Sequence, residues 1–118
     1  MTRTRNITIG HTYEFTAVVT EAMKASLHGV PVHDLYGTTA MIAHMEWAAR
    51  QHILDSLEPG EEGVGYAIHV THLNPTPIGA TVRVRSEVTG VVTEPSGVVK
   101  VTSRVAAWIV YDSSLARE

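Results

Sequence analysis

The stretch from Thr38 to about Ser56 is the feature that most constrains the fold of this chain. Ala, Met, Ile, Leu, Arg and Gln dominate it, and no Gly or Pro occurs until residues 59–60, so it predicts one long helix. Thr38 or Thr39 is expected to be the N-cap. Apolar residues cover much of the helix circumference, so we expect it to be buried on several sides, most deeply in its N-terminal half.

Four other segments are rich in β-branched and aromatic residues and predict strands. They cover residues 11–20, 64–73, 81–92 and 98–111. The last three are joined by short links with turn residues, which favours antiparallel neighbours, and the third alternates between valines and charged residues, which indicates one wet face. One apolar helix and such a sheet share a core when the sheet curls around the helix, so we expect one α+β domain over residues 1–118.

Residues 21–37 contain Gly29, Pro31 and Gly37, which predicts a loop or a short irregular segment. Because it precedes the start of the predicted helix, this segment is either a lid over a site or a plain connection. Sequence patterns do not decide between the two.

Composition excludes several classes of protein. The chain has 118 residues, a net charge of −3 and no Lys/Arg cluster, so no nucleic-acid partner is expected. It has no cysteine, which excludes disulfides, thiolate catalysis and cysteine-ligated metals. No apolar run approaches the roughly 20 residues that cross a bilayer, and the N-terminus lacks the apolar core of a signal peptide, so we expect a cytoplasmic protein with no membrane partner.

Two residues stand in unusual surroundings. Glu46 lies in mid-helix between Met45 and Trp47, where a carboxylate either reaches a polar cleft as a catalytic base or nucleophile, or lies on a wet side of the helix. His72 ends a predicted strand before a Pro-rich turn, where it is either well placed for proton transfer or a surface or interface histidine.

Two further residues have a functional and a structural interpretation each. Thr38 is expected to cap the helix, and its hydroxyl could also point at a substrate oxygen beside the free N–H groups there. Gly65 either allows a ligand to approach the strand closely or marks a bulge.

The histidines do not predict a metal site. His69 and His72 would face opposite ways on a strand, and His44 and His52 do not form the HExxH pattern. The absence of GxSxG, P-loop and GxGxxG motifs argues against serine hydrolases, P-loop enzymes and Rossmann dehydrogenases.

The run MEWAARQHILDSLEPGEEGVGYAIHVTHLNPTPIGATVRVRSEV resembles the fluoroacetyl-CoA thioesterase family of hotdog-fold proteins. Members carry a MEWA-like helix core, a turn like LEPGE, and a strand ending in VTH before a Pro-containing turn and a TV-rich strand. The match extends from about Thr38 to Val88. It implies a hotdog fold, a curved antiparallel sheet around one long helix, and a homodimer formed by sheet pairing.

The family's catalytic threonine, glutamate and histidine fall on Thr38, Glu46 and His72, and a glycine near its acyl pocket falls on Gly65. The resemblance implies hydrolysis of a small acyl-CoA or acyl-carrier thioester, with coenzyme A as part of the substrate and no other cofactor. Glu46 would attack the thioester carbonyl or activate water, His72 would assist proton transfer, and Thr38 would orient or polarise groups.

The chain departs from the family in two places. The family's lid carries phenylalanines, whereas GVPVHDLYG carries none, so Val32 and Tyr36 are the expected substrate-binding residues and no preference for a fluorinated acyl group is predicted. Members also continue with a further strand beyond the position of Tyr111. The sheet is therefore expected to be one strand short, to pair differently, or to belong to a trimmed chain, and an exposed edge would favour dimerisation or swapping. A complete sheet supplied by Trp108 to Leu115 would contradict the expectation of a missing strand.

Two alternatives to a thioesterase stay open. Hotdog proteins also include dehydratases, hydratases and polyketide-pathway enzymes, and a non-catalytic protein that binds acyl thioesters would share the fold. Arg83, Arg85 and Arg104 are available to recognise coenzyme A, although we expect them to be solvated charges on a strand face.

Overall fold

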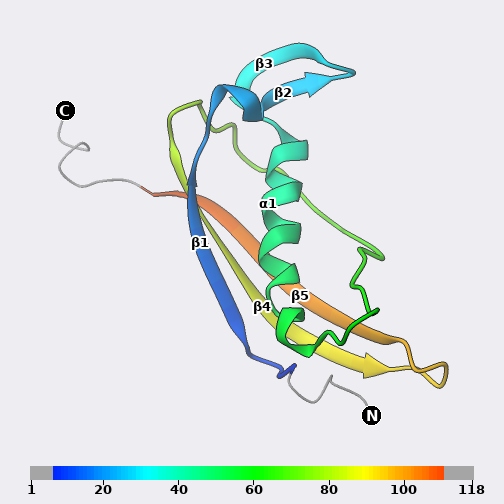
Figure 1. Ribbon diagram of the computed structural model, residues 1–118. Coiled ribbons are helices and arrows are strands. Elements are labelled where there is room, and N and C mark those ends of the chain that lie inside the picture. The colour runs from blue at the N-terminus through cyan, green and yellow to red at the C-terminus, as the bar shows by residue number, and fades with distance from the viewer. Residues whose placement is uncertain (1–6, 111–118) are drawn as a thin grey trace.

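A three-stranded antiparallel sheet forms the framework of the protein. A computed structural model describes residues 7–110. The sheet has the order β1-β4-β5, with β1 over Thr12–Val18, β4 over Thr81–Thr93 and β5 over Val99–Val110 (Figure 1). Three of the four predicted strands are therefore confirmed. The part of the last one at Tyr111, and any completion of the sheet as far as Leu115, lie outside the described residues.

The two faces of the sheet differ as the alternation in β4 predicts. Val82, Val84, Ser86 and Val88 are buried toward the helix, and the residues that alternate with them point to the other face. On that outer face the Glu14 carboxylate of β1 pairs with Arg83 at 3.2 Å and with Arg85 at 3.8 Å, both on the neighbouring β4. The prediction of one wet face is confirmed.

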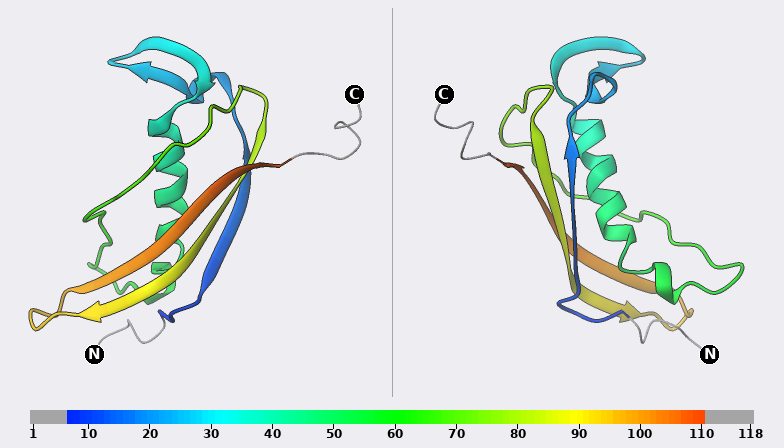
Figure 2. Two further views of the ribbon diagram at one scale, coloured as in Figure 1. Left: turned by 180° about the vertical axis from the view of Figure 1, so that it is seen from behind. Right: turned by 60° about the vertical axis from the view of Figure 1, so that its left-hand side comes forward.

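The helix α1 extends over Thr38–Arg50 and lies along the concave face of the sheet (Figure 2). It starts at the predicted residue but ends earlier than predicted, in turns and a short 3₁₀ segment, η3, over Leu54–Ser56. Its N-cap is Gly37, with no side-chain cap hydrogen bond, so the prediction of a threonine N-cap was wrong. No helix in residues 7–110 is long and apolar enough to span a membrane.

The expectation that α1 is buried on several sides was also wrong. Within α1 only Met41 and Ala48 are buried, whereas Trp47 is 53% exposed. A helix on one face of a sheet has a single side to bury, and among the described residues only an extended segment passes its other side. Met41 joins Val19, Tyr36 and Val82 in the core cluster.

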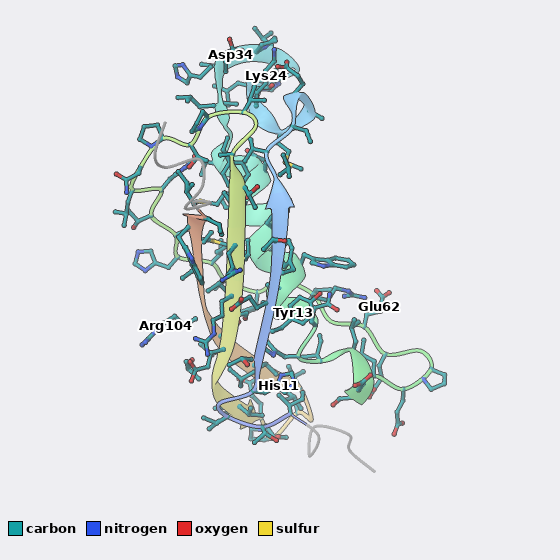
Figure 3. The ribbon with its side chains drawn as sticks, turned by 90° about the vertical axis from the view of Figure 1, so that its left-hand side faces the viewer. His11, Tyr13, Lys24, Asp34, Glu62 and Arg104 are labelled. Carbon is teal, nitrogen blue, oxygen red and sulfur yellow. The ribbon has the colours of Figure 1, made fainter. Side chains whose placement is uncertain are left out.

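Residues 21–37, expected to be irregular, form a short 3₁₀ turn, η2 (Glu21–Met23), and a hairpin of β2 (Lys24–Leu27) and β3 (Val30–Tyr36). His28 and Gly29 make its two-residue turn, with φ of 52° and 77°. Two consecutive positive φ angles are what a tight hairpin turn requires, and glycine supplies one of them without strain. The hairpin extends beyond the N-terminal end of α1, and Lys24 and Asp34 approach across it at 3.7 Å (Figure 3).

The predicted strand over residues 64–73 is not formed. The segment from 61 to 76, the connecting segment, is extended but lacks strand pairing within the described chain, and only Leu35 and Pro77 form an isolated bridge beyond its end. Burial does not alternate along it, since Tyr66 and Val70 are four residues apart, yet Tyr66 is 81% exposed and Val70 packs against the core. A strand also needs a neighbouring backbone to share hydrogen bonds, and residue pattern alone does not supply one.

Candidate active site

Thr38 and His72, far apart in the sequence, meet at the N-terminal end of α1. Thr38 Oγ1 and His72 Nδ1 are hydrogen-bonded at 2.9 Å. Both residues lie in the wall of a hollow of about 270 Å³, together with Tyr36 and the end of the connecting segment. The Thr38 hydroxyl, which was expected to cap the helix, is instead engaged by the histidine.

Backbone contacts bring the three parts of this site together. The Tyr36 N–H donates to the Thr76 carbonyl at 2.7 Å, which ties the end of β3 to the segment carrying His72. The Gly37 N–H donates to the Met23 carbonyl at 2.8 Å. A Cβ atom on Gly37 would lie 3.0 Å from the backbone Cα of Ala25, so glycine lets the hairpin pack closely where α1 begins.

Glu46 lies further along α1. It comes eight residues after Thr38, so it is about 12 Å away along the helix axis. Its side chain is exposed in the single chain. A Cβ atom on Gly65 would lie 2.8 Å from Glu46 Oε2, so the connecting segment passes directly beside this carboxylate.

The structure thus makes two pairs from the four residues that the resemblance singled out. Thr38 meets His72, and Glu46 meets Gly65. In each pair one residue belongs to α1 and the other to the connecting segment, and no hydrogen bond within residues 7–110 joins the two pairs directly. The site is therefore a strip between the helix and this segment.

The two expected substrate-binding residues of the hairpin are placed differently. Tyr36 is 3% exposed and contributes to the wall of the hollow. Val32 is 46% exposed on β3 and is not part of that wall.

A part-buried hydrogen bond involving Tyr36 was missed from the sequence. The Tyr36 hydroxyl lies 2.5 Å from His44 Nδ1. Burial raises the pKa of Tyr36 to about 12, and burial lowers the pKa of His44 below its ordinary value of 6.5. The available signal was spacing, since His44 falls on the same helix face as Met41 and Ala48, the two buried residues of α1.

The arginines considered for coenzyme A lie on the other face of the sheet. Arg85 and Arg104 line a shallow depression of about 120 Å³ with Glu87 and Trp108. Arg104 projects from β5 in Figure 3. Within this chain these cations are separated from Thr38 and His72 by the sheet itself, as expected for solvated strand-face charges.

The curved sheet around one helix, with a threonine–histidine pair at the helix start, places the protein among the hotdog-fold thioesterase superfamily. A crystal structure of a Thermus thermophilus member of that superfamily superposes with a TM-score of 0.75 and 38% identity, covering 89% of this chain and 74% of that one. The sequence profile of the fluoroacetyl-CoA-specific thioesterases matches residues 19–111. The chain belongs to this family.

Two relatives within the family support the assignment. The fluoroacetyl-CoA thioesterase of Streptantibioticus cattleyicolor is 43% identical over 58 residues, which are 49% of this chain and 42% of that protein. The matched region therefore covers less than half the length of this relative. A mutant of the fluoroacetyl-CoA-specific thioesterase FlK, in complex with fluoroacetate and CoA, superposes with a TM-score of 0.74 and 30% identity, covering 86% of this chain and 82% of that one.

Proposed function

We propose that this protein hydrolyses a small acyl-CoA thioester at the strip between α1 and the connecting segment. The observation that carries the proposal is the hydrogen bond of 2.9 Å between Thr38 Oγ1 and His72 Nδ1 in the wall of a hollow. A hydroxyl and an imidazole so arranged can orient a carbonyl and move a proton. Membership of a thioesterase family supports the same chemistry.

Hydrolysis of a thioester adds water across the bond between the acyl carbon and sulfur. The water oxygen joins the carbonyl carbon, the C–S bond breaks, and sulfur leaves as a thiol after gaining a proton. We assign the proton transfer to His72 and polarisation of the carbonyl oxygen to Thr38, helped by the first-turn N–H groups of α1, which have no acceptor inside the helix. Glu46 attacks the carbonyl carbon or activates the water, and coenzyme A enters only as part of the substrate.

The hollow favours a short acyl group. Its volume of about 270 Å³ is below the range of about 300–1,000 Å³ that is usual for sites holding drug-sized ligands. Tyr36 adds an aromatic surface to its wall. The hairpin tip has valine and leucine in place of aromatic residues, so we propose no selectivity for fluorine.

We also propose that the working unit is a homodimer. The connecting segment exposes several apolar side chains, with Val64 82%, Tyr66 81% and Leu73 79% exposed. The edge of β5 away from β4 has no strand beside it in the described part of the chain. A second copy that covers this side would bury both features, which light scattering coupled to size exclusion would show as twice the mass of the chain.

A thiol-release assay tests the proposed activity. The protein has no cysteine, so a thiol-reactive dye reports only coenzyme A released from a panel of acyl-CoA esters. Release from short-chain esters that depends on Thr38 and His72 is the expected result. A dehydratase would consume a hydroxyacyl thioester without releasing thiol, and a binding protein would retain the ester intact, so either outcome would overturn the proposal.

A further inference from the structure

We propose that His44 is a positioning residue of the site: through the Tyr36 hydroxyl it holds the Tyr36 ring against His72 and so fixes the imidazole that faces Thr38. The proposal deepens the proposed function, and its kinetic consequence rests on that function. Its structural consequence, the fixed state of the His72 ring, can be measured without any turnover.

Contacts form a continuous chain from the inside of the sheet to the site. The Phe15 ring of β1 meets the His44 ring edge-on, with centroids 5.7 Å apart and planes at 78°. His44 Nδ1 is 2.5 Å from the Tyr36 hydroxyl. The Tyr36 ring in turn meets the His72 ring at 6.3 Å and 79°, an edge-to-face arrangement within the usual range for aromatic pairs.

The direction of the central hydrogen bond follows from the environment. Burial raises the pKa of Tyr36 to about 12, so its hydroxyl keeps its proton at neutral pH. Burial lowers the pKa of His44, so its imidazole is neutral there. No other acceptor within residues 7–110 contacts the Tyr36 hydroxyl, so we infer that it donates to His44 Nδ1 and that the single ring proton of His44 is on Nε2.

His72 is then constrained from two directions. Its Nδ1 is engaged by Thr38, and its ring plane is set by Tyr36. Because Tyr36 is 3% exposed and hydrogen-bonded at its far end, its ring cannot turn away without leaving a part-buried histidine nitrogen unpaired. Nε2 is the nitrogen of His72 that Thr38 leaves for a substrate.

Three variants test this role. Tyr36→Phe keeps the ring and removes the donor, His44→Leu removes the acceptor at similar volume, and His44→Asn keeps an acceptor near the position of Nδ1. Long-range ¹H–¹⁵N NMR reports the tautomer of His72 directly. We expect one tautomer in the wild-type protein and in His44→Asn, and a mixture in Tyr36→Phe and His44→Leu.

Turnover gives the second measurement. We expect kcat to fall about tenfold in Tyr36→Phe and in His44→Leu with little change in KM, because a small misplacement of a catalytic group is costly. The double variant should be no worse than either single one, since both remove the same hydrogen bond. His44→Asn should recover most of the rate.

His52→Leu is the matched control. Like His44, His52 has its pKa lowered by burial. It is itself buried, and it is hydrogen-bonded to Ser86 at 2.8 Å just beyond the end of α1. This variant should lower the melting temperature while leaving the His72 tautomer unchanged. If Tyr36→Phe and His44→Leu behave like this control, His44 is merely structural and the proposal fails. If no thioester is cleaved but the tautomer responds as expected, the positioning stands and the proposed function fails.

Discussion

Gly65 lies directly against the carboxylate of Glu46: a Cβ atom on Gly65 would be 2.8 Å from Glu46 Oε2. Real Cβ atoms essentially never show contacts this short, so a side chain at residue 65 would have to displace the end of the Glu46 side chain. The contact joins Glu46, which is expected to be catalytic, to Gly65, which is expected to let a ligand approach closely.

Gly65→Ala is predicted to lower activity much more than stability. The new methyl group displaces the end of a flexible, exposed side chain, which costs little folding free energy, but it moves the Glu46 carboxylate from its place beside the site. Turnover of the best acyl-CoA ester and the urea midpoint of the variant give the two measurements.

Gly90→Ala is the matched control, because a Cβ atom on Gly90 would make only an ordinary contact of 3.7 Å with Thr102. Equal losses of turnover in both variants would contradict the assigned role of Gly65.

Glu46→Ala and His72→Ala are each predicted to lose most of the turnover while the fold survives. Loss of an acid–base group typically costs about 10²–10⁴-fold in rate. Glu46 is exposed and His72 is half-buried, so neither change should greatly lower the free energy of unfolding. Single-turnover thiol release measures the loss of activity, and circular dichroism shows whether the fold survives. Rates near the wild-type value in both variants would exclude the assigned mechanism.

Stability is predicted to fall as the pH is lowered through the range in which histidine titrates. Burial, and secondarily the nearby His11, lower the pKa of His52 below its ordinary value of 6.5, and burial lowers the pKa of His44. The unfolded chain therefore binds more protons than the folded one just below pH 6.5, and the free energy of unfolding decreases with decreasing pH.

The local geometry explains the effect at His52. Its Nδ1 lies 2.7 Å from His11 Nδ1, at the end of the molecule opposite the hairpin (Figure 3), and its Nε2 lies 2.8 Å from Ser86 Oγ. The free energy of unfolding, measured with urea between about pH 8 and about pH 5, should depend less steeply on pH in His52→Gln than in the wild-type protein. The exposed His28→Asn, which keeps a residue tolerant of positive φ, should leave the dependence as it is in the wild type.

Removal of the outer-face cations is predicted to leave substrate binding unchanged. Arg85 and Arg104 lie on the face of the sheet opposite α1, beside Glu87 and Trp108. Arg85→Gln and Arg104→Gln should therefore keep the wild-type KM for an acyl-CoA ester, measured by initial rates at two salt concentrations. A severalfold rise in KM in either variant would show that this face takes part in binding coenzyme A.

Much of the fold follows from local patterns. The alternation of valine with arginine in β4 predicts both the strand and its wet face, and the helix begins at Thr38 as expected. Local patterns fail where a neighbour decides the outcome. Residues 64–73 have the composition of a strand but no adjacent backbone in the described chain, and the Thr38 hydroxyl bonds His72 instead of capping the helix.

The site is predictable only in part for the same reason. Glu46 and His72 stand out by their surroundings in the sequence, but periodicity cannot bring a helix and a distant segment together, and the resemblance supplied that link. The Tyr36–His44 bond is absent from any short motif because it joins the end of β3 to the second turn of α1 through side chains alone. In the sequence, neither Tyr36 nor His44 stands out from the hydrophobic pattern around it.

The connecting segment carries one half of the site, but almost no backbone hydrogen bonds hold it in place. In the described chain, residues 62–76 donate no backbone–backbone hydrogen bond, whereas Thr38 begins a regular helix. Amide protons of this segment should therefore exchange with solvent at a cost far below global unfolding, while those of β4 exchange only when the whole domain opens. The pairing of Thr38 with His72 is then an equilibrium between docked and undocked states of the connecting segment. The population of the docked state sets an upper limit on the fraction of molecules that can bind and cleave a substrate at any moment.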